Sequence, residues 1–123
     1  MSLTKRSTKG SALTYTEMDD NLTFLDLYKS VQNISGPGAI SLTTGVTLIT
    51  TTGTNAYTLA DGTEGQIKII SMKVKGGGNG TVTPDNFING TSLLFNNVED
   101  TVILLYQSTG WILIARQNAT VQA

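Results

Sequence analysis

The 123-residue sequence contains no cysteine and no histidine. Without cysteine it has no disulfide, no thiolate nucleophile and no cysteine-ligated zinc or iron–sulfur site. Without histidine it has no imidazole base or imidazole metal ligand. The commonest catalytic groups are therefore missing, and we expect a non-enzymatic protein with no cofactor and no metal.

Charged residues are also scarce. They make up 14% of the chain, against roughly 25% in an average soluble protein, and the formal net charge is −1. Nucleic-acid binding and membrane docking both need clustered Lys or Arg, and the one basic cluster is Lys5, Arg6 and Lys9 near the N-terminus. We therefore expect no nucleic-acid partner and no membrane partner.

No apolar run approaches the roughly 20 residues of a membrane span, and the first ten residues contain no apolar signal core. We therefore expect the chain to be made in the cytosol. Residues 1–12 show no pattern and are expected to form a flexible arm.

A helix is predicted from about residue 15 to about residue 32. Thr14 and Glu17 have the spacing of a capping box at its start, and the Gly-Pro-Gly at 36–38 cannot continue it. Its apolar residues lie on two nearly opposite faces, which a lone helix in water would not expose.

We expect one face, together with the arm, to attach the chain to another protein, and the other face to meet copies of itself at heptad spacing. The predicted anchor residues are Lys9, Leu13, Tyr15, Met18, Leu22 and Leu25. The predicted self-associating face consists of Phe24, Leu27, Val31 and Ile34. The alternative is that both faces pack on the chain's own β domain.

From residue 39 onward the pattern changes to strands and turns, rich in Thr, Val, Ile and Leu. Strands are predicted at 46–51, 56–60, 66–75, 80–83, 101–107 and 111–116. The predicted fold is mainly β. An N-terminal arm and single α-helix (1–38) precede a compact antiparallel β-sandwich or barrel-like domain (39–123).

The strand at 66–75 has an irregular pattern. Apolar Ile67 and Ile69 alternate with polar Gln66 and Lys68, and then the apolar positions shift by one at Ile70. Such a shift predicts a β-bulge, or a change of packing layer, near Ile69 and Ile70.

The last predicted hairpin is continuously apolar, at Val102–Tyr106 and Trp111–Ala115. Such strands are covered on both faces, and a domain of this size has difficulty covering both. We therefore predict that one face meets another subunit. The predicted interface residues from the hairpin are Ile103, Leu105, Trp111 and Leu113. The alternative is that the hairpin is the core of a closed barrel or sandwich.

Tyr106 and Trp111 could also form a platform on which a glycan stacks. In a continuous apolar strand, packing in a core or an interface explains them better. A glycan partner is therefore only weakly supported by the sequence.

Two parts of the sequence resemble proteins of tailed-phage virions. The segment Thr8–Leu22 (TKGSALTYTEMDDNL) resembles a short motif near the N-termini or internal joints of tail fibres and head-attached fibres. The β region is similar to trimeric β modules of the same proteins. That similarity lies in Tyr57–Lys68 (YTLADGTEGQIK), Thr81–Pro84, the strand Val102–Tyr106 and the Gly110-Trp111 turn.

The resemblance implies a non-enzymatic capsid decoration protein or short head fibre on the virion surface, assembled in the host cytoplasm. It also implies a homotrimer whose N-terminal region binds the major capsid protein or another virion protein. A trimer, as opposed to a dimer, follows from the resemblance alone. The alternative is a short tail fibre or adaptor that binds carbohydrate on the host surface.

Overall fold

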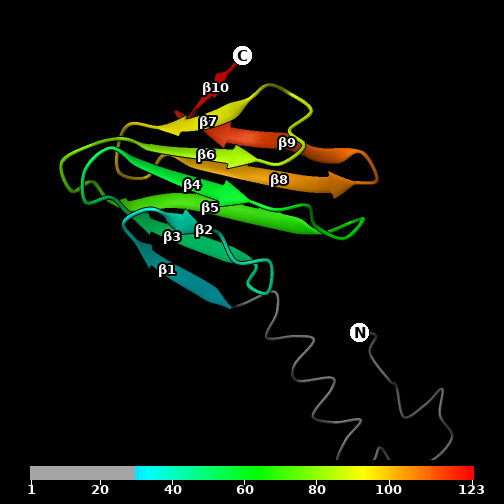
Figure 1. Cartoon of the computed structure of the whole chain (residues 1–123), viewed down its shortest axis with the longest axis horizontal. Helices are drawn as coiled ribbons and strands as arrows, with labels where there is room; N and C mark the ends of the chain where they lie inside the picture. Colours follow the sequence, from blue (N-terminus) through cyan, green and yellow to red (C-terminus); the bar gives the residue numbers. More distant parts are fainter. Residues whose placement is uncertain (1–29) are drawn as a thin grey trace, which may run out of the picture.

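The computed structural model describes residues 30–123, which form ten β-strands and no helix (Figure 1). The prediction of a mainly β protein is therefore confirmed for this part of the chain. The predicted arm and most of the predicted helix lie outside these residues.

The strands form two five-stranded sheets, which we call sheet A and sheet B. In spatial order, sheet A consists of β1 (Val31–Ser35), β3 (Val46–Thr50), β5 (Ile67–Val74), β8 (Thr101–Gln107) and β9 (Gly110–Gln117). Sheet B consists of β10 (Thr120–Gln122), β7 (Ser92–Phe95), β6 (Gly80–Pro84), β4 (Asn55–Leu59) and β2 (Gly38–Ala39).

The first six strands alternate between the two sheets. The chain therefore winds through three stacked turns, each of which contributes one strand to sheet A and one to sheet B. In sheet A, β1 pairs parallel with β3, and β3 parallel with β5. In sheet B, β2 pairs parallel with β4, and β4 parallel with β6. The last four strands then pair antiparallel, two in each sheet.

Both sheets are therefore mixed, and the prediction of an antiparallel domain is wrong for the first six strands. The alternation of apolar residues indicates a strand but does not name its partner. Here consecutive strands lie in different sheets. The chain therefore returns to each sheet in the same direction, and neighbouring strands within that sheet are parallel.

The end of the predicted helix is also wrong. Residues Val31–Ser35 form β1, which pairs along its whole length with β3. The Gln32 side chain strengthens this pairing, because its Oε1 accepts hydrogen bonds from Thr47 Oγ1 (2.9 Å) and from the backbone N–H of Ser41 (2.8 Å). We call the two sheets formed by residues 30–123 the β unit. Residues 31–38 therefore belong to the β unit and not to the predicted arm and helix.

The predicted bulge near Ile69 and Ile70 does not occur there. Side chains alternate regularly through this part of β5, with Lys68, Ile70 and Met72 buried. The register shift lies further along, where Ile49 of β3 faces Met72 and the next residue, Thr50, faces Val74. The prediction of a bulge failed because Lys68, although polar, points inward and is buried.

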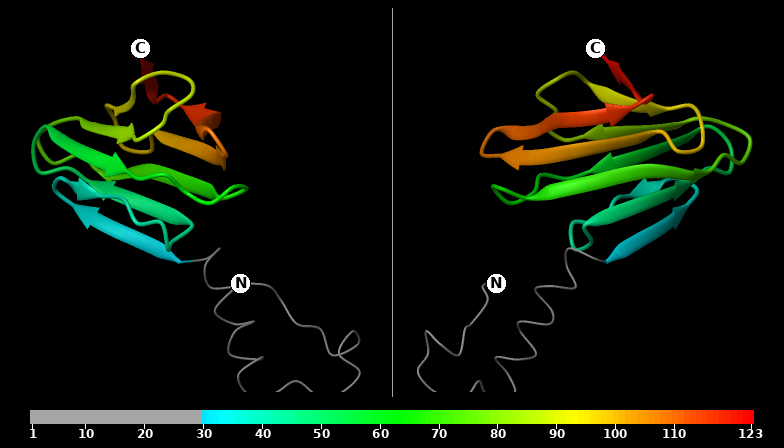
Figure 2. Two further views of the ribbon diagram at one scale, coloured as in Figure 1. Left: turned by 45° about the vertical axis from the view of Figure 1, so that its right-hand side comes forward. Right: turned by 180° about the vertical axis from the view of Figure 1, so that it is seen from behind.

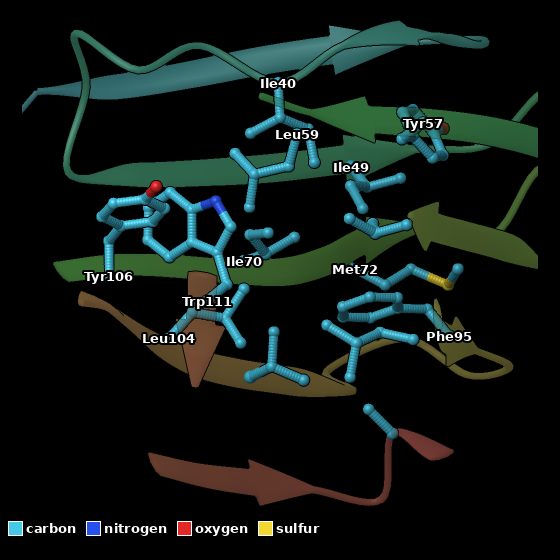
Figure 3. Packing of buried hydrophobic residues seen from close by; sticks show 14 residues of the cluster. Ile40, Ile49, Tyr57, Leu59, Ile70, Met72, Phe95, Leu104, Tyr106 and Trp111 are labelled. Carbon is cyan, nitrogen blue, oxygen red and sulfur yellow. The ribbon is translucent and has the colours of Figure 1, made fainter. Parts of the chain in front are cut away.

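One apolar core lies between the two sheets, as Figure 3 shows. Trp111 is its largest side chain and is fully buried. The indole Nε1–H donates to the carbonyl oxygen of Ala60 at 2.9 Å, and the ring packs edge-on against Tyr106 with centroids 5.2 Å apart. The core thus satisfies the polar atom of its largest residue.

The two ends of sheet A differ. At the β9 end, the loop after β6 covers the edge. Trp111 N–H donates to Asn86 O at 2.7 Å, Ile88 N–H donates to Trp111 O at 2.9 Å, and Leu113 N–H donates to Asn89 Oδ1 at 2.9 Å. At the other end, β1 pairs only with β3 within residues 30–123. The two views in Figure 2 show β1 and β9 at opposite ends of the stack.

Candidate subunit interface

The outer face of sheet A, which points away from the core, is apolar along two rows that cross the strands. The first row contains Ile67, Leu105 and Ile112, which are register partners on β5, β8 and β9. The second row crosses all five strands through Val31, Val46, Ile69, Ile103 and Ala115. We call these eight residues the apolar band.

Parts of the apolar band are well exposed. Ile67 is 53% exposed and Val31 is 45% exposed. Ile114 lies beside the band where the register shifts between β8 and β9, and it is 57% exposed. Covering a Val, Leu or Ile side chain fully contributes about 1.5–3 kcal/mol, so burying this band against another surface would be strongly favourable.

The apolar band ends abruptly along the strand direction. The next row of register partners is mostly polar: Asn33, Leu48, Ser71, Thr101 and Gln117. Within that row, the hydroxyls of Ser71 and Thr101 hydrogen-bond to each other at 2.8 Å. The band is therefore two rows wide along the strands, and one of these rows crosses five strands while the other crosses three.

The outer face of sheet B has a different composition. Its register partners on the solvent side are Ala39, Ala56, Thr58, Thr81, Thr83, Leu94 and Thr120. Apart from Leu94, these residues are threonine and alanine, which expose little apolar area, so this face is suited to water. The difference between the two faces identifies the outer face of sheet A as the candidate interface.

The predicted interface residues divide into three groups. Val31, Ile103 and Leu105 lie in the apolar band. Ile34 and Leu113 point inward and pack against the core. Trp111 is 0% exposed, so its assignment to an interface is wrong, because a continuously apolar strand does not reveal which alternate residues face the core.

The remaining predicted site residues lie outside the described part of the chain. These are Phe24 and Leu27 of the interface, and the anchor residues Lys9, Leu13, Tyr15, Met18, Leu22 and Leu25.

Sequence reasoning missed six residues of this face: Val46, Ile67, Ile69, Ile112, Ile114 and Ala115. The alternation of Ile67 and Ile69 with Lys68 was visible in the sequence, but the shift at Ile70 was interpreted as a bulge or a change of packing layer. An inward Lys68 would have revealed the exposed face of β5.

Lys68 is a buried cation directly behind the apolar band. Its side chain is 0% exposed, and Nζ donates to both the carbonyl oxygen and Oγ1 of Thr44, each at 2.8 Å. Burial disfavours the charged form and lowers the pKa of Lys68 from 10.5 to about 8. The lysine therefore links the loop before β3 to β5.

Tyr106 and Trp111 do not form the glycan platform that the sequence left as the weaker alternative to packing. The indole of Trp111 has no exposed surface, and Tyr106 is only 9% exposed. Burial, and then the nearby charge of Asp61, raise the pKa of the Tyr106 hydroxyl. Both rings therefore serve packing within the chain.

Within residues 30–123, no group of three acidic, histidine or cysteine side chains is placed to hold a metal ion. No helix in this part of the chain is long and apolar enough to cross a membrane. Comparison of the chain with protein-family models and with curated proteins gives no match.

Proposed function

We propose that the chain is a non-enzymatic structural protein of a tailed-phage virion, which decorates the capsid as a decoration protein or short head fibre. The virion role is supported by the resemblance of the sequence to virion proteins, and association is supported by the contrast between the two outer faces of the β unit. One face has an apolar band suited to association, and the other has threonine and alanine suited to water.

The partner at the apolar band is proposed to be another copy of the chain, in a homotrimer. The resemblance to trimeric β modules supports three copies. The exposed apolar side chains Val31 and Ile67 support association as such, because their burial is favourable and a single chain leaves them in water.

Attachment is proposed to occur through residues 1–29, which contain all the predicted anchor residues. The proposed partner is the major capsid protein or another virion protein. The position of β1 supports this division of roles, because residue 30 enters the β unit beside Val31, at the end of the apolar band. The attachment element and the association face therefore adjoin.

A truncation tests the attachment role. A chain that lacks residues 1–29 keeps all ten strands, whereas a cut at residue 38 would remove β1. We expect the truncated chain to retain its β spectrum in circular dichroism and to lose co-sedimentation with capsids of the phage that encodes it. Undiminished capsid binding by the truncated chain would refute the anchor assignment.

A second experiment tests the decoration role. The full chain, labelled with a gold cluster, should appear at regular positions on the heads of intact virions in electron micrographs. Labels confined to the tail would instead indicate a tail fibre or adaptor.

A further inference from the structure

The sequence contains two Asn-Gly pairs, Asn79-Gly80 and Asn89-Gly90, and threonine follows each of them. The side-chain amide of asparagine is chemically weakest when glycine comes next, because no Cβ shields the following backbone nitrogen from the amide carbon. Since the two pairs have the same local sequence, a difference in their reactivity within the folded chain must come from the structure around them.

The Asn79-Gly80 pair is held within sheet B. Gly80 is buried at the start of β6, and it is a register partner of Asn55 on β4 and of Phe95 on β7. The carbonyl oxygen of Asn79 accepts a hydrogen bond from Asn55 N–H at 3.0 Å. Pairing on both sides fixes the backbone here, so the Gly80 nitrogen becomes free to attack the Asn79 side chain only when β6 separates from a neighbour.

The Asn89-Gly90 pair lies in the loop that covers the edge of β9. Asn89 is exposed. Within residues 30–123, neither the backbone N–H of Gly90 nor the Nδ2 group of Asn89 makes a hydrogen bond. The Oδ1 atom of Asn89, by contrast, accepts from Leu113 N–H at 2.9 Å. This pair therefore combines a free backbone nitrogen, a leaving group on an exposed residue and a side-chain carbonyl that a backbone donor polarises.

We propose that Asn89 is a site of spontaneous deamidation in the folded chain, whereas Asn79 is protected by its strand. The modification needs no enzyme and no reagent other than water. It does not depend on the proposed virion role, because it follows from the surroundings of the two Asn-Gly pairs alone.

The reaction balances with water as its only co-reactant. The Gly90 nitrogen gives its proton to hydroxide and attacks Cγ of Asn89, and the carbonyl electron pair moves to Oδ1, where Leu113 N–H stabilises the negative charge. The intermediate then collapses, the Cγ–Nδ2 bond breaks, and the nitrogen takes a proton from water and leaves as ammonia. Water opens the resulting succinimide at either carbonyl, which gives aspartate or isoaspartate.

The isoaspartate product would disturb the loop. It adds a methylene to the backbone between two anchored residues. On one side Ile88 N–H donates to Trp111 O at 2.9 Å, and on the other Thr91 N–H donates to Gln122 O at 2.7 Å. The space is tight, because a Cβ on Gly90 would lie 2.5 Å from Gln122 O. The longer backbone therefore weakens the cover over the β9 edge, and an uncovered edge can pair with other chains.

Mass spectrometry of the full chain during incubation at mildly alkaline pH measures the reaction. Replacement of the amide by a carboxylate adds about 1 Da, and fragment spectra of the tryptic peptide 76–116 separate the two sites. In the folded chain we expect Asn89 to react about tenfold or more faster than Asn79, because Asn79 must wait for β6 to open. In urea the two rates should become similar.

Two matched variants assign the signal. Asn89→Gln should remove most of the mass increase of the folded chain, because glutamine must close a larger ring, whereas Asn79→Gln should leave it unchanged. Circular dichroism confirms that both variants fold. Equal rates at the two asparagines of the folded chain, a faster rate at Asn79, or no reaction at Asn89 would overturn the proposal.

Hydroxylamine gives a second readout that needs no variant, because it cleaves the chain at the succinimide. The folded chain should yield fragments 1–89 and 90–123, and the fragments 1–79 and 80–123 should join them only in urea. Hydrogen exchange tests the effect on the loop: the amide of Leu113 should exchange faster in the isoaspartate form. Unchanged exchange would overturn the weakened cover while leaving the modification site standing.

Discussion

Raising the pH from 8 to 10 is expected to stabilise this protein, and the reason is Lys68. Its ammonium group is buried with only neutral oxygens of Thr44 as hydrogen-bond acceptors. Burial lowers its pKa to about 8 in the folded chain, against 10.5 for an ordinary lysine. Between these two values the unfolded chain binds a proton that the folded chain has released.

The sign follows from this difference in bound protons. Since the unfolded state binds more protons in that window, the free energy of unfolding increases with pH. Each unit of pKa difference corresponds to about 1.4 kcal/mol, so the full effect is about 3 kcal/mol, of which about 2 kcal/mol falls between pH 8 and pH 10. Below pH 8 the contribution changes little, because both states are then protonated.

Urea denaturation at fixed protein concentration, monitored by circular dichroism at pH 7, 8, 9 and 10, measures the effect. Lys68→Met should make the free energy of unfolding nearly independent of pH between 8 and 10. Lys73→Met, on the exposed end of the same strand, is the matched control and should keep the increase.

Measurements should stop near pH 10. The pKa values of Tyr57 and Tyr106 are both raised in the folded chain, so ionisation of these tyrosines in the unfolded chain already opposes folding slightly near pH 10 and does so increasingly above it. A stability that stays level or falls from pH 8 to pH 10 in the unmodified chain would refute the assignment of Lys68 as a buried cation.

Three further substitutions test the packing and the interface. Gly110→Ala places a Cβ 2.1 Å from the carbonyl oxygen of Asn86 at a φ of 151°, and thermal melts should show a loss of about 1–3 kcal/mol. Trp111→Phe removes the indole hydrogen bond to the carbonyl oxygen of Ala60 and leaves a void where the larger, fully buried indole packed, which should cost about 1–3 kcal/mol in urea titrations; an unchanged midpoint would contradict this. If copies of the chain associate through the apolar band, Leu105→Lys, which introduces a charge there, should yield monomers in light scattering, whereas Thr58→Lys on sheet B should leave the association unchanged.

The strands with strong apolar patterns could be predicted from the sequence. Six predicted ranges correspond to β3, β4, β5, β6, β8 and β9, with ends that agree within about two residues. Four strands were missed. β2, β7 and β10 are only two to four residues long, which is too short for an alternation to be visible.

β1 was missed for a different reason. Val31 and Ile34 are three residues apart, which continues the spacing of the predicted helix, and local sequence cannot show that β3 is available as a partner. Tertiary pairing decides such ambiguous segments. The same limit explains the parallel pairs, since strand order depends on contacts between residues that are distant in the sequence.

The candidate interface was predictable in part. The continuous apolar pattern of the last hairpin correctly indicated that Ile103 and Leu105 lie on a second apolar face. It could not separate this face from the core face, and so it also included Trp111, which is buried. The contribution of β5 stayed hidden, because a buried lysine reverses the apparent inside and outside of a strand.

The stacked turns of the first six strands also determine how such a unit can change in length. Each turn adds one strand to each sheet, and the antiparallel strands that follow β6 close only the last turn. An insertion of one whole turn between β3–β4 and β5–β6 would lengthen the stack by about 5 Å without altering either end. Because each turn contacts mainly its neighbours, as in repeat proteins, variants of different height could share the same first strand and the same closing strands.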